Sequence, residues 1–311
     1  MTKNQSKGSR SVAVAEPVRE GCPGCGGTAF EALFPATDRL YRSTDTKFLL
    51  VECAKCRLLR LQPRPRNAAR PSAAVVWPQG DTLADRIERA YRRFVMDDDI
   101  RFLLSVFDRT EATGPILDLS PDNEPFRRAI EPYCFDVIAS RPDFEKPPVA
   151  PGSCSAITML HVLEKLEDPA AILEQVRVLL EPDGRLIVRS ANAACWQFLM
   201  FGERWSRLDV PRRPILFRGR DLERLLEYCG FEVLRRKHFS WRSNPADFAT
   251  SVAPCLDPIA RRGRGVTDGP FLSTLKHLLY LGLVASAVPL TVIEAACRAG
   301  STITLEARRK W

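Results

Sequence analysis

Four cysteines near the start of the chain form two pairs with the same internal spacing. Cys22-Pro-Gly-Cys25 and Cys53-Ala-Lys-Cys56 each read Cys-x-x-Cys, and residues 26–52 separate them. Two such hairpins can bring four thiolates into a tetrahedron around Zn²⁺, and a site with four protein ligands has no open position for a substrate. The spacing therefore predicts a structural zinc site. A redox pair and buried thiols that fill a core are the alternatives.

The chain contains ten cysteines, and its first twenty residues are polar and charged, without an apolar stretch. A secretory signal peptide needs such a stretch. We therefore expect a cytoplasmic protein whose thiols stay reduced and form no disulfide framework. The six other cysteines show no paired spacing, and we expect buried or half-buried thiols there.

His161 is one of only three histidines, and it follows an apolar run at 155–160 that reads as a strand. Ligands of open α/β sheets bind at the carboxyl ends of the strands. His161 is therefore a candidate catalytic residue and a candidate cofactor contact. A structural histidine is the alternative.

The 311 residues carry a net charge of +8, with 46 Lys and Arg against 38 Asp and Glu. The arginines are scattered along the chain, and no helix-turn-helix, RNA-recognition or C2H2 pattern accompanies them. We expect an arginine-rich solvated surface and no nucleic-acid partner. The sequence gives no indication of an oligomeric state.

Strands and helices alternate in the second half of the chain, and this alternation must position the candidate residues. Strands are predicted at 115–119, 135–139, 155–160, 185–189, 231–235 and 302–307, and helices at 168–180 and 221–229. Pro182-Asp-Gly184 predicts a turn before the strand at 185–189. The pattern is typical of an open α/β sheet covered on both faces.

Composition divides the chain into four parts. A disordered tail is predicted at 1–20, a zinc ribbon at 21–65, a linker and N-terminal helix at 66–110, and an α/β domain at 111–311. Residues 240–300 read as a helical insertion before the last strand. These boundaries place the cysteine pairs in a small module ahead of the sheet.

Residues 278–293 form an uncharged run that contains Gly282 and Pro289. A membrane-spanning helix needs roughly 17–25 apolar residues, so this run is too short. A buried or broken helix packed on the sheet is one interpretation. Peripheral docking on a membrane, with Arg261 to Arg264 contacting anionic lipid, is the other.

Two stretches carry a resemblance to a known family. His161-Val-Leu-Glu-Lys-Leu-Glu-Asp-Pro169 is followed by Leu179-Leu-Glu-Pro-Asp-Gly-Arg-Leu-Ile-Val188. Their order resembles the central signature of class I S-adenosylmethionine-dependent methyltransferases, and the likeness covers roughly Gly114 to Lys310. Members of this family with an N-terminal four-cysteine zinc module resemble the segment from Cys22 to Cys56 as well.

The resemblance implies a fold, a donor and a set of contacts. The fold would be a Rossmann-like methyltransferase sheet that lacks one strand–helix unit and follows a small zinc ribbon. The donor would be S-adenosylmethionine, with Asp118, Ser120 and His161 as cofactor contacts. Matching positions also imply substrate contacts at Trp205, Asp209 and Arg212.

The chain departs from the family pattern in its first half. The family's D-x-G-x-G-x-G motif reads Asp118-Leu-Ser120-Pro-Asp122-Asn-Glu124, so side chains occupy all three glycine positions. Glycines there let the backbone approach the cofactor closely. In addition, the stretch from Asp118 to Ile157 is shorter than two strands and two helices usually need.

Two functions follow from these observations. In the first, the protein is a methyltransferase that acts on a small molecule or on a sugar- or lipid-linked substrate. In the second, it is a degenerate relative that has lost the donor and acts as a binding or partner subunit. The family resemblance favours the first function, and the lost glycines favour the second.

Overall fold

The computed structural model describes residues 21–65, 100–109, 113–120, 135–142, 147–266 and 268–310, with single residues between 86 and 133. The predictions for residues 1–20, for the linker at 66–85 and for Asp122 and Glu124 lie outside the described residues.

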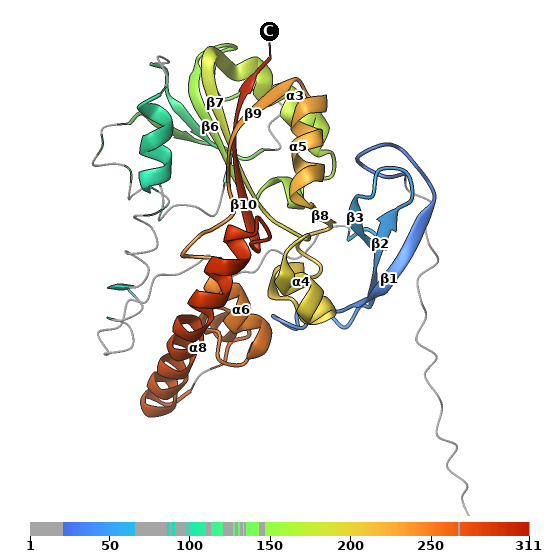
Figure 1. Cartoon of the computed structure of the whole chain (residues 1–311), viewed down its shortest axis with the longest axis vertical. Coiled ribbons are helices and arrows are strands. Elements are labelled where there is room, and N and C mark those ends of the chain that lie inside the picture. Colours follow the sequence, from blue (N-terminus) through green and yellow to red (C-terminus); the bar gives the residue numbers. More distant parts are fainter. Residues whose placement is uncertain are drawn as a thin grey trace, which may run out of the picture.

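A four-stranded antiparallel sheet contains the cysteine module (Figure 1). It consists of β1 (Phe30–Ala36), β2 (Phe48–Cys53), β3 (Leu59–Gln62) and β8 (Ile215–Leu216), in the order β1-β2-β3-β8. Strand β8 comes from the predicted α/β domain, and its residue Leu216 pairs with Leu59 of β3. The segment predicted as a ribbon at 21–65 is therefore joined to the rest of the protein by backbone hydrogen bonds.

The larger sheet confirms the predicted fold class. Its strands are β4 (Ile116–Asp118), β5 (Val137–Ala139), β6 (Cys154–Leu160), β7 (Leu180–Ala191), β9 (Phe231–Lys237) and β10 (Thr302–Arg309). The spatial order is β5-β4-β6-β7-β10-β9. The first four strands are parallel, and β10 is antiparallel to both of its neighbours.

The connection between β5 and β6 explains the short first half of the domain. Residues 140–153 lead from the end of β5, across β4, to the start of β6. A parallel crossover needs a dozen or more residues, so this segment has room for one crossover only. The segment is too short for a further strand and helix. This agrees with the expectation that the sheet lacks one strand–helix unit.

Helices cover both faces of the larger sheet (Figure 1). Helices α3 (Pro169–Leu179) and α5 (Gly219–Tyr228) lie on one face, and a helical segment at 100–107 lies on the other. Successive side chains of β7 point to opposite faces of the sheet, as in any β-strand. Leu186 and Val188 belong to the core beneath α3 and α5, whereas Ile187 packs in the core beside residues 100–107.

The predicted turn at Pro182-Asp-Gly184 lies inside β7. Cys154 pairs with Leu180, and Ala156 pairs with Arg185. One residue of β6 between these pairs therefore lies opposite residues 181–184 of β7. The extra residues form a bulge in the strand, which is a common way to absorb an insertion. The turn-forming residues thus bend the strand without ending it.

Short helices connect the two sheets. They are η2 (Leu163–Lys165), α4 (Trp196–Phe201), η3 (Gly202–Arg204) and η4 (Ser206–Leu208). Side chains of α4 and of the loops after it pack against β2 and β3 in a second hydrophobic cluster that includes Trp205 and Leu50. This cluster and the β3–β8 pairing fix the cysteine module to the larger sheet.

The predicted helical insertion contains α6 (Asn244–Val252), α7 (Pro258–Gly263) and α8 (Pro270–Ala296). Helix α8 continues through Pro289, packs along α6 and extends away from the larger sheet (Figure 1). Its segment Phe271–Ala296 is long and apolar enough to cross a membrane by length and composition, with a mean hydropathy of 1.8 and 28% of its apolar window buried. The interpretation as a broken helix packed on the sheet is therefore wrong, because the apolar run is part of a longer, continuous helix.

Candidate functional site

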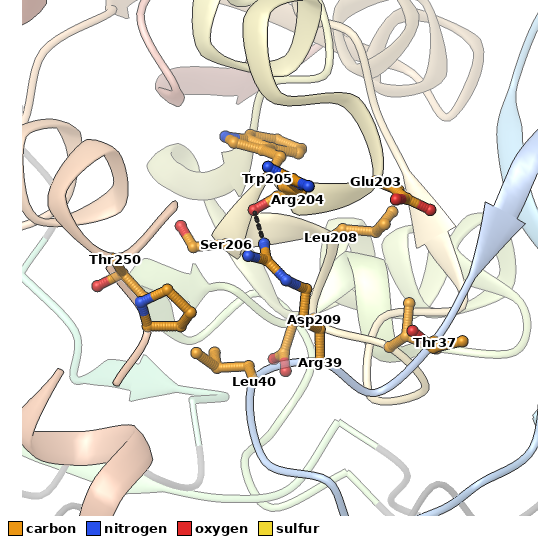
Figure 2. A pocket seen from close by; sticks show the side chains of 12 residues that line it. Thr37, Arg39, Leu40, Glu203, Arg204, Trp205, Ser206, Leu208, Asp209 and Thr250 are labelled. Atoms are coloured by element: carbon orange, nitrogen blue, oxygen red, sulfur yellow. Dashed lines mark hydrogen bonds between the residues drawn. The ribbon is translucent and has the colours of Figure 1, made fainter. Parts of the chain in front are cut away.

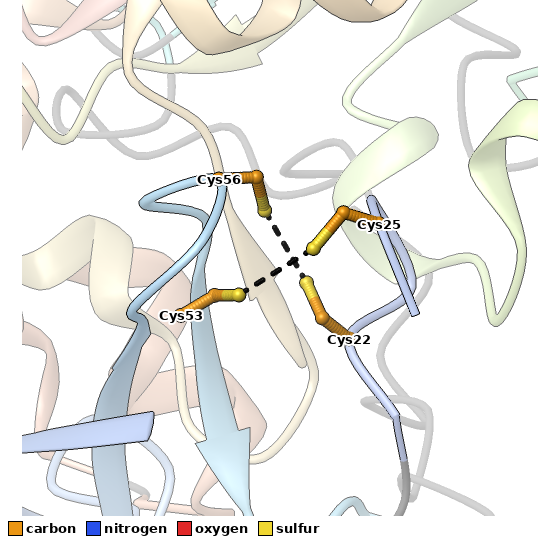
Figure 3. Close-up of side chains that lie close together, drawn as sticks. All are labelled: Cys22, Cys25, Cys53 and Cys56. Atoms are coloured by element: carbon orange, nitrogen blue, oxygen red, sulfur yellow. Dashed lines mark hydrogen bonds between the residues drawn. The ribbon is translucent and has the colours of Figure 1, made fainter. Parts of the chain in front are cut away.

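The four predicted metal ligands lie together between the loop before β1 and the turn after β2 (Figure 3). The Sγ atoms of Cys22 and Cys56 are 3.5 Å apart, those of Cys25 and Cys53 are 3.6 Å apart, and all four lie within 4.8 Å of one another. Four sulfurs bound to a tetrahedral Zn²⁺ at about 2.3 Å lie about 3.8 Å apart. The cluster could therefore hold a metal ion, as the paired spacing predicts.

Glycines allow the first cysteine turn to close around the sulfurs. Gly26 has a φ of +69°, and its N–H donates to the Cys22 carbonyl at 2.8 Å. A Cβ on Gly27 would lie 3.3 Å from the Sγ of Cys25 and 3.5 Å from that of Cys53. A side chain at Gly27 would thus crowd the space that the sulfurs share.

Backbone amides favour the thiolate form of one ligand. Burial raises the pKa of the Cys53 thiol, but hydrogen bonds from the backbone N–H groups of Cys56 and Lys55 lower this pKa to about 7. The thiolate is the form of cysteine that binds metals. In the same turn, burial and the neighbouring thiols raise the pKa of Cys56, so of these two cysteines the protein alone favours the thiolate only at Cys53.

The predicted cofactor contacts Asp118 and Ser120 follow the core of β4 and are only 1% and 3% exposed. Asp118 accepts hydrogen bonds from the Thr158 hydroxyl at 2.8 Å, from the Ser120 N–H at 3.0 Å and from the Arg127 guanidinium at 3.1 Å. The Ser120 hydroxyl accepts from the Leu160 N–H at 2.8 Å. Both side chains hold the end of β4 to β6, and Arg127 donates to the Asp118 carboxylate and to the Ser120 carbonyl.

The cofactor that the resemblance implies does not fit these two residues as they stand. Binding groups for a nucleotide-like cofactor need free hydrogen-bonding capacity that faces a cleft. Asp118 is instead buried and bonded to three groups of the protein. Residues 121–126, which follow Ser120, lie outside the part of the chain that the structure describes.

Both ring nitrogens of His161 have partners. Nε2 lies 3.1 Å from Nη2 of Arg207, and Nδ1 lies 3.1 Å from Oε1 of Glu164. A guanidinium can only donate, so Nε2 must accept and Nδ1 carries the proton. Burial and the Arg207 cation hold the pKa of His161 well below its ordinary value near 6.5, against the opposing effect of Glu164.

Glu164 of η2 is completely buried beneath His161. One of its carboxylate oxygens accepts from Arg213 at 2.9 Å, and the other accepts from the Ser190 hydroxyl at 3.1 Å. Burial alone would raise the pKa of Glu164, but the Arg213 cation and His161 hold it far below its usual range. Glu164 is therefore an anion that neutralises Arg213 inside the protein.

Arg207 also contacts the helical insertion at 240–300. Its Nε lies 3.0 Å from Oδ2 of Asp247 in α6, and its Nη2 donates to the Ser243 hydroxyl at 3.1 Å. The Ser301 hydroxyl also donates to Asp247, at 2.9 Å. Arg207 thus covers His161 and is itself fixed by a buried carboxylate.

The predicted substrate contacts Asp209 and Arg212 take part in a second ion cluster. Nε of Arg212 donates to Asp209 at 2.8 Å, and its Nη2 donates to Asp38 of the cysteine module at 2.9 Å. The side chains of Arg212 and Asp38 are 5% and 0% exposed. The structure therefore places Arg212 in a bridge between the two sheets.

Trp205, the third predicted substrate contact, is 2% exposed and packs edge-on against Phe198 with ring centroids 5.2 Å apart. It lines a cavity of about 20 Å³ between the loop at 37–40 and the segment at 203–210, where Arg39 donates to the Arg204 carbonyl (Figure 2). Such a volume accommodates about one water molecule. The role of Trp205 in substrate binding stays a prediction.

Sequence reasoning did not single out Glu164, Arg207 or Asp247 as site residues. Glu164 lies three residues after His161, and a carboxylate at that spacing can reach the histidine ring. In the methyltransferase resemblance, the family's Pro-Arg-His reads Pro211-Arg-Arg213 in this chain, and the exchange of that histidine for Arg213 was the available signal for the ion pair with Glu164. Arg207 and Asp247 gave no such signal.

Comparisons with known proteins agree with this architecture. Residues 87–236 match a protein family described as "Methyltransferase domain". No protein among the curated ones matches the chain.

Several solved structures are similar to this chain at low sequence identity. A SAM-dependent methyltransferase from Thermotoga maritima is 12% identical, with 72% of this chain and 97% of that chain covered and a TM-score of 0.38. A SAM-dependent methyltransferase from Archaeoglobus fulgidus is 12% identical, with coverages of 73% and 100% and a TM-score of 0.42. A cyclopropane synthase from Mycobacterium tuberculosis is 14% identical, with coverages of 67% and 83% and a TM-score of 0.41.

The assignment rests on the matched domain, because all three TM-scores are below 0.5. The match ends within β9 and includes β4 to β7 and the turn at His161, whereas β10 lies outside it. The chain therefore contains a region similar to a methyltransferase domain, and a four-cysteine cluster lies in front of that region.

Proposed function

We propose that this protein is a family member that no longer transfers methyl groups and acts as a binding or partner subunit. The observation that carries the proposal is the environment of His161, whose two nitrogens are occupied by Glu164 and Arg207. A general base must offer a free lone pair to the proton that it removes. On His161 that lone pair already accepts from a guanidinium.

Moving Arg207 aside would be unfavourable. Its guanidinium forms a buried ion pair with Asp247, and its withdrawal would leave that carboxylate without its cation. Breaking a buried pair by removing one partner costs about 3–5 kcal/mol. The closed arrangement is therefore the stable one, and His161 supports the site as a neutral structural group.

The donor side of the sheet supports the same conclusion. Ser120 occupies the first glycine position of the family motif, and its hydroxyl is bonded to the Leu160 N–H of β6. Arg127 supplies a cation to Asp118 from within the chain. Side chains thus make contacts at the strand ends where the family's glycines leave room for a cofactor.

An active methyltransferase is the second candidate, because the matched domain extends over residues 87–236 and Asp118 is retained. S-adenosylmethionine would supply the methyl group, and the chain would accelerate transfer by holding the acceptor in line. The acceptor would be a small molecule or a sugar- or lipid-linked compound. Trp205, Asp209 and Arg212 would need to become accessible to it.

We assign Zn²⁺ to the cysteine cluster. Cys22, Cys25, Cys53 and Cys56 would hold it, and four thiolates are the ligand set of closed structural zinc sites. The metal would hold together the two Cys-x-x-Cys turns, which have few buried apolar side chains of their own. A reducing, cytoplasmic location belongs to the same proposal, since the ligands must stay reduced.

Titration of the His161 ring by nuclear magnetic resonance tests the proposal. With only three histidines in the chain, a His161→Gln variant assigns the signal. Burial and Arg207 hold the pKa of His161 well below its ordinary value near 6.5, so the ring should be neutral at pH 6.5, with its proton on Nδ1. An Arg207→Met variant should raise this pKa, because it removes the cation.

A His161 ring that titrates near pH 6.5 in the unmodified protein would mean that the site is open to solvent. The lone pair on Nε2 would then be available to a substrate, and the non-catalytic proposal would fail.

A further inference from the structure

One face of α8 is exposed and carries no charge. Phe271 is 81% exposed, Leu275 42%, Leu279 52% and Ile293 55%. The other exposed positions described on this helix are also uncharged: Leu272, Leu278, Gly282, Ala285, Ser286, Pro289, Val292 and Ala296. A helix that faces water normally carries polar residues on its outer side, so this face is suited to an apolar environment.

The opposite face of α8 is fixed to the protein. Buried side chains recur at every third or fourth position: Tyr280, Val284, Ala287, Thr291 and Glu294. The hydroxyls of Tyr280 and Thr250 of α6 are 3.0 Å apart, and Glu294 accepts from Gln197 at 3.0 and 2.9 Å. The helix is therefore attached along one side and uncovered along the other.

Basic residues gather at the projecting end of this face. Residues 258–280 contain Arg261, Arg262, Arg264 and Lys276 against one acid, Asp268. Asp268 is ion-paired with both Arg261 and Lys276, so it contributes no net negative charge to this end. The same end exposes apolar side chains at Ile259 and Val266 in addition to Phe271.

Aromatic side chains lie at the other end of the face. Val292 of α8 lines an open groove of about 460 Å³ together with Phe239 and Trp241, whose rings meet edge to face with centroids 5.0 Å apart. Arg236 and Lys237 line the same groove, where they are ion-paired with Glu223 and Asp98 and add no net charge. Tryptophan beside cationic side chains is typical of the boundary between headgroups and hydrocarbon.

We propose that α8 docks this protein on an anionic lipid bilayer, lying in the plane of the interface. The uncharged face would enter the boundary between headgroups and acyl chains, to a depth of about 5–10 Å. Arg262 and Arg264 would meet anionic headgroups at one end, where each basic side chain adds to the attraction. The charge complementarity at this end selects lipid over a second copy of the chain, since two such ends would repel each other.

The attached face of α8 excludes a spanning arrangement. A spanning helix would have to leave α6, and Glu294 would lose its hydrogen bonds with Gln197. Leaving buried polar groups without their partners is unfavourable. The in-plane orientation keeps every one of these contacts.

Vesicle flotation tests the proposal with the full-length chain. Vesicles of phosphatidylcholine alone are compared with vesicles that contain phosphatidylglycerol at about one third of the lipid. We expect binding to the anionic vesicles, weakening as salt is raised, and at least tenfold weaker binding to the neutral ones.

Matched variants assign the binding to the proposed face. Leu275→Glu with Leu279→Glu places two carboxylates on the face and should weaken vesicle binding at least tenfold. Tyr228→Glu is the control, because Tyr228 is 81% exposed on α5, away from α8 (Figure 1). Arg262→Glu with Arg264→Glu should remove the preference for anionic lipid. Circular dichroism confirms that each variant is folded.

Three results would overturn the proposal. One is equal binding to neutral and anionic vesicles. Another is a protein that does not bind vesicles and forms a dimer, as measured by light scattering. If the variant with Leu275→Glu and Leu279→Glu is then monomeric, the exposed face of α8 binds a second copy of the chain. The third is resistance of the expressed protein to alkaline extraction from membranes, which would indicate a spanning helix.

Discussion

At His161 the backbone adopts a φ of +59°, and the ring lies between Glu164 and Arg207 with 21% of the side chain exposed. Arg213 stands where the resembled family has a histidine, and it pairs with Glu164. A guanidinium stays charged at every physiological pH, whereas an imidazole can exchange protons near pH 7. The arginine thus replaces a group suited to proton transfer with a permanent ion pair.

The cysteine cluster allows a test at single residues. Cys53→Ser should reduce bound zinc from about one equivalent to less than half, because serine is a poor fourth ligand. Loss of a structural metal typically costs more than about 2 kcal/mol, which lowers Tm by about 4–8 °C for a domain of this size. Elemental analysis and thermal unfolding measure both effects.

Cys255→Ser is the matched control for this substitution. Cys255 is exposed and lies outside the cluster, so zinc content and Tm should be unchanged. Full zinc content in Cys53→Ser would show that the metal does not need the four-thiolate set.

At the scale of elements, the sequence predicts the helices and strands that show a periodic apolar pattern within their own residues. The strand at 154–160 and the helix at 169–179 follow from uninterrupted apolar periodicity, and Asp168 caps the helix by accepting from the Ala171 N–H at 3.0 Å. The turn predicted at Pro182 to Gly184 is wrong, because β7 runs through these residues and they form a bulge against β6.

Two elements could not be predicted, for different reasons. Strand β8 has only two residues, Ile215 and Leu216, and exists because β3 lies beside it. Helix α8 was cut short in the prediction because Lys276 and His277 interrupt the uncharged run. In the structure Lys276 is turned toward Asp268, so the helix continues through it.

The bridge between the cysteine module and the larger sheet yields a prediction at this scale. Asp38→Ala should destabilise the protein by about 3 kcal/mol or more, because it leaves the buried Arg212 without one of its carboxylates. Urea unfolding measures the change. Glu232→Ala is the control: its pair with Arg308 is roughly half exposed, so less than about 1 kcal/mol is expected.

An equal effect of the two substitutions would contradict this account of the bridge. It would mean that Asp38 and Arg212 contribute no more than an exposed ion pair, and that apolar packing alone joins the two sheets.

At the scale of the whole molecule, the closed site depends on segments far apart in the sequence. Arg207 reaches His161 from forty-six residues away, and Asp247 holds Arg207 from the insertion. No local pattern reports such contacts, which is why the family and the metal ligands could be predicted and the closure could not. The lost glycines after Asp118 and the arginine at position 213 were the warnings in the sequence.

The central claim is that the molecule does not bind the donor of its family. Isothermal titration calorimetry tests it by adding S-adenosylmethionine to the full-length, zinc-loaded protein. The account predicts no saturable heat up to millimolar donor, because Asp118 and Ser120 are committed to bonds within the protein. A saturable isotherm with a micromolar Kd would contradict it and would favour the active methyltransferase.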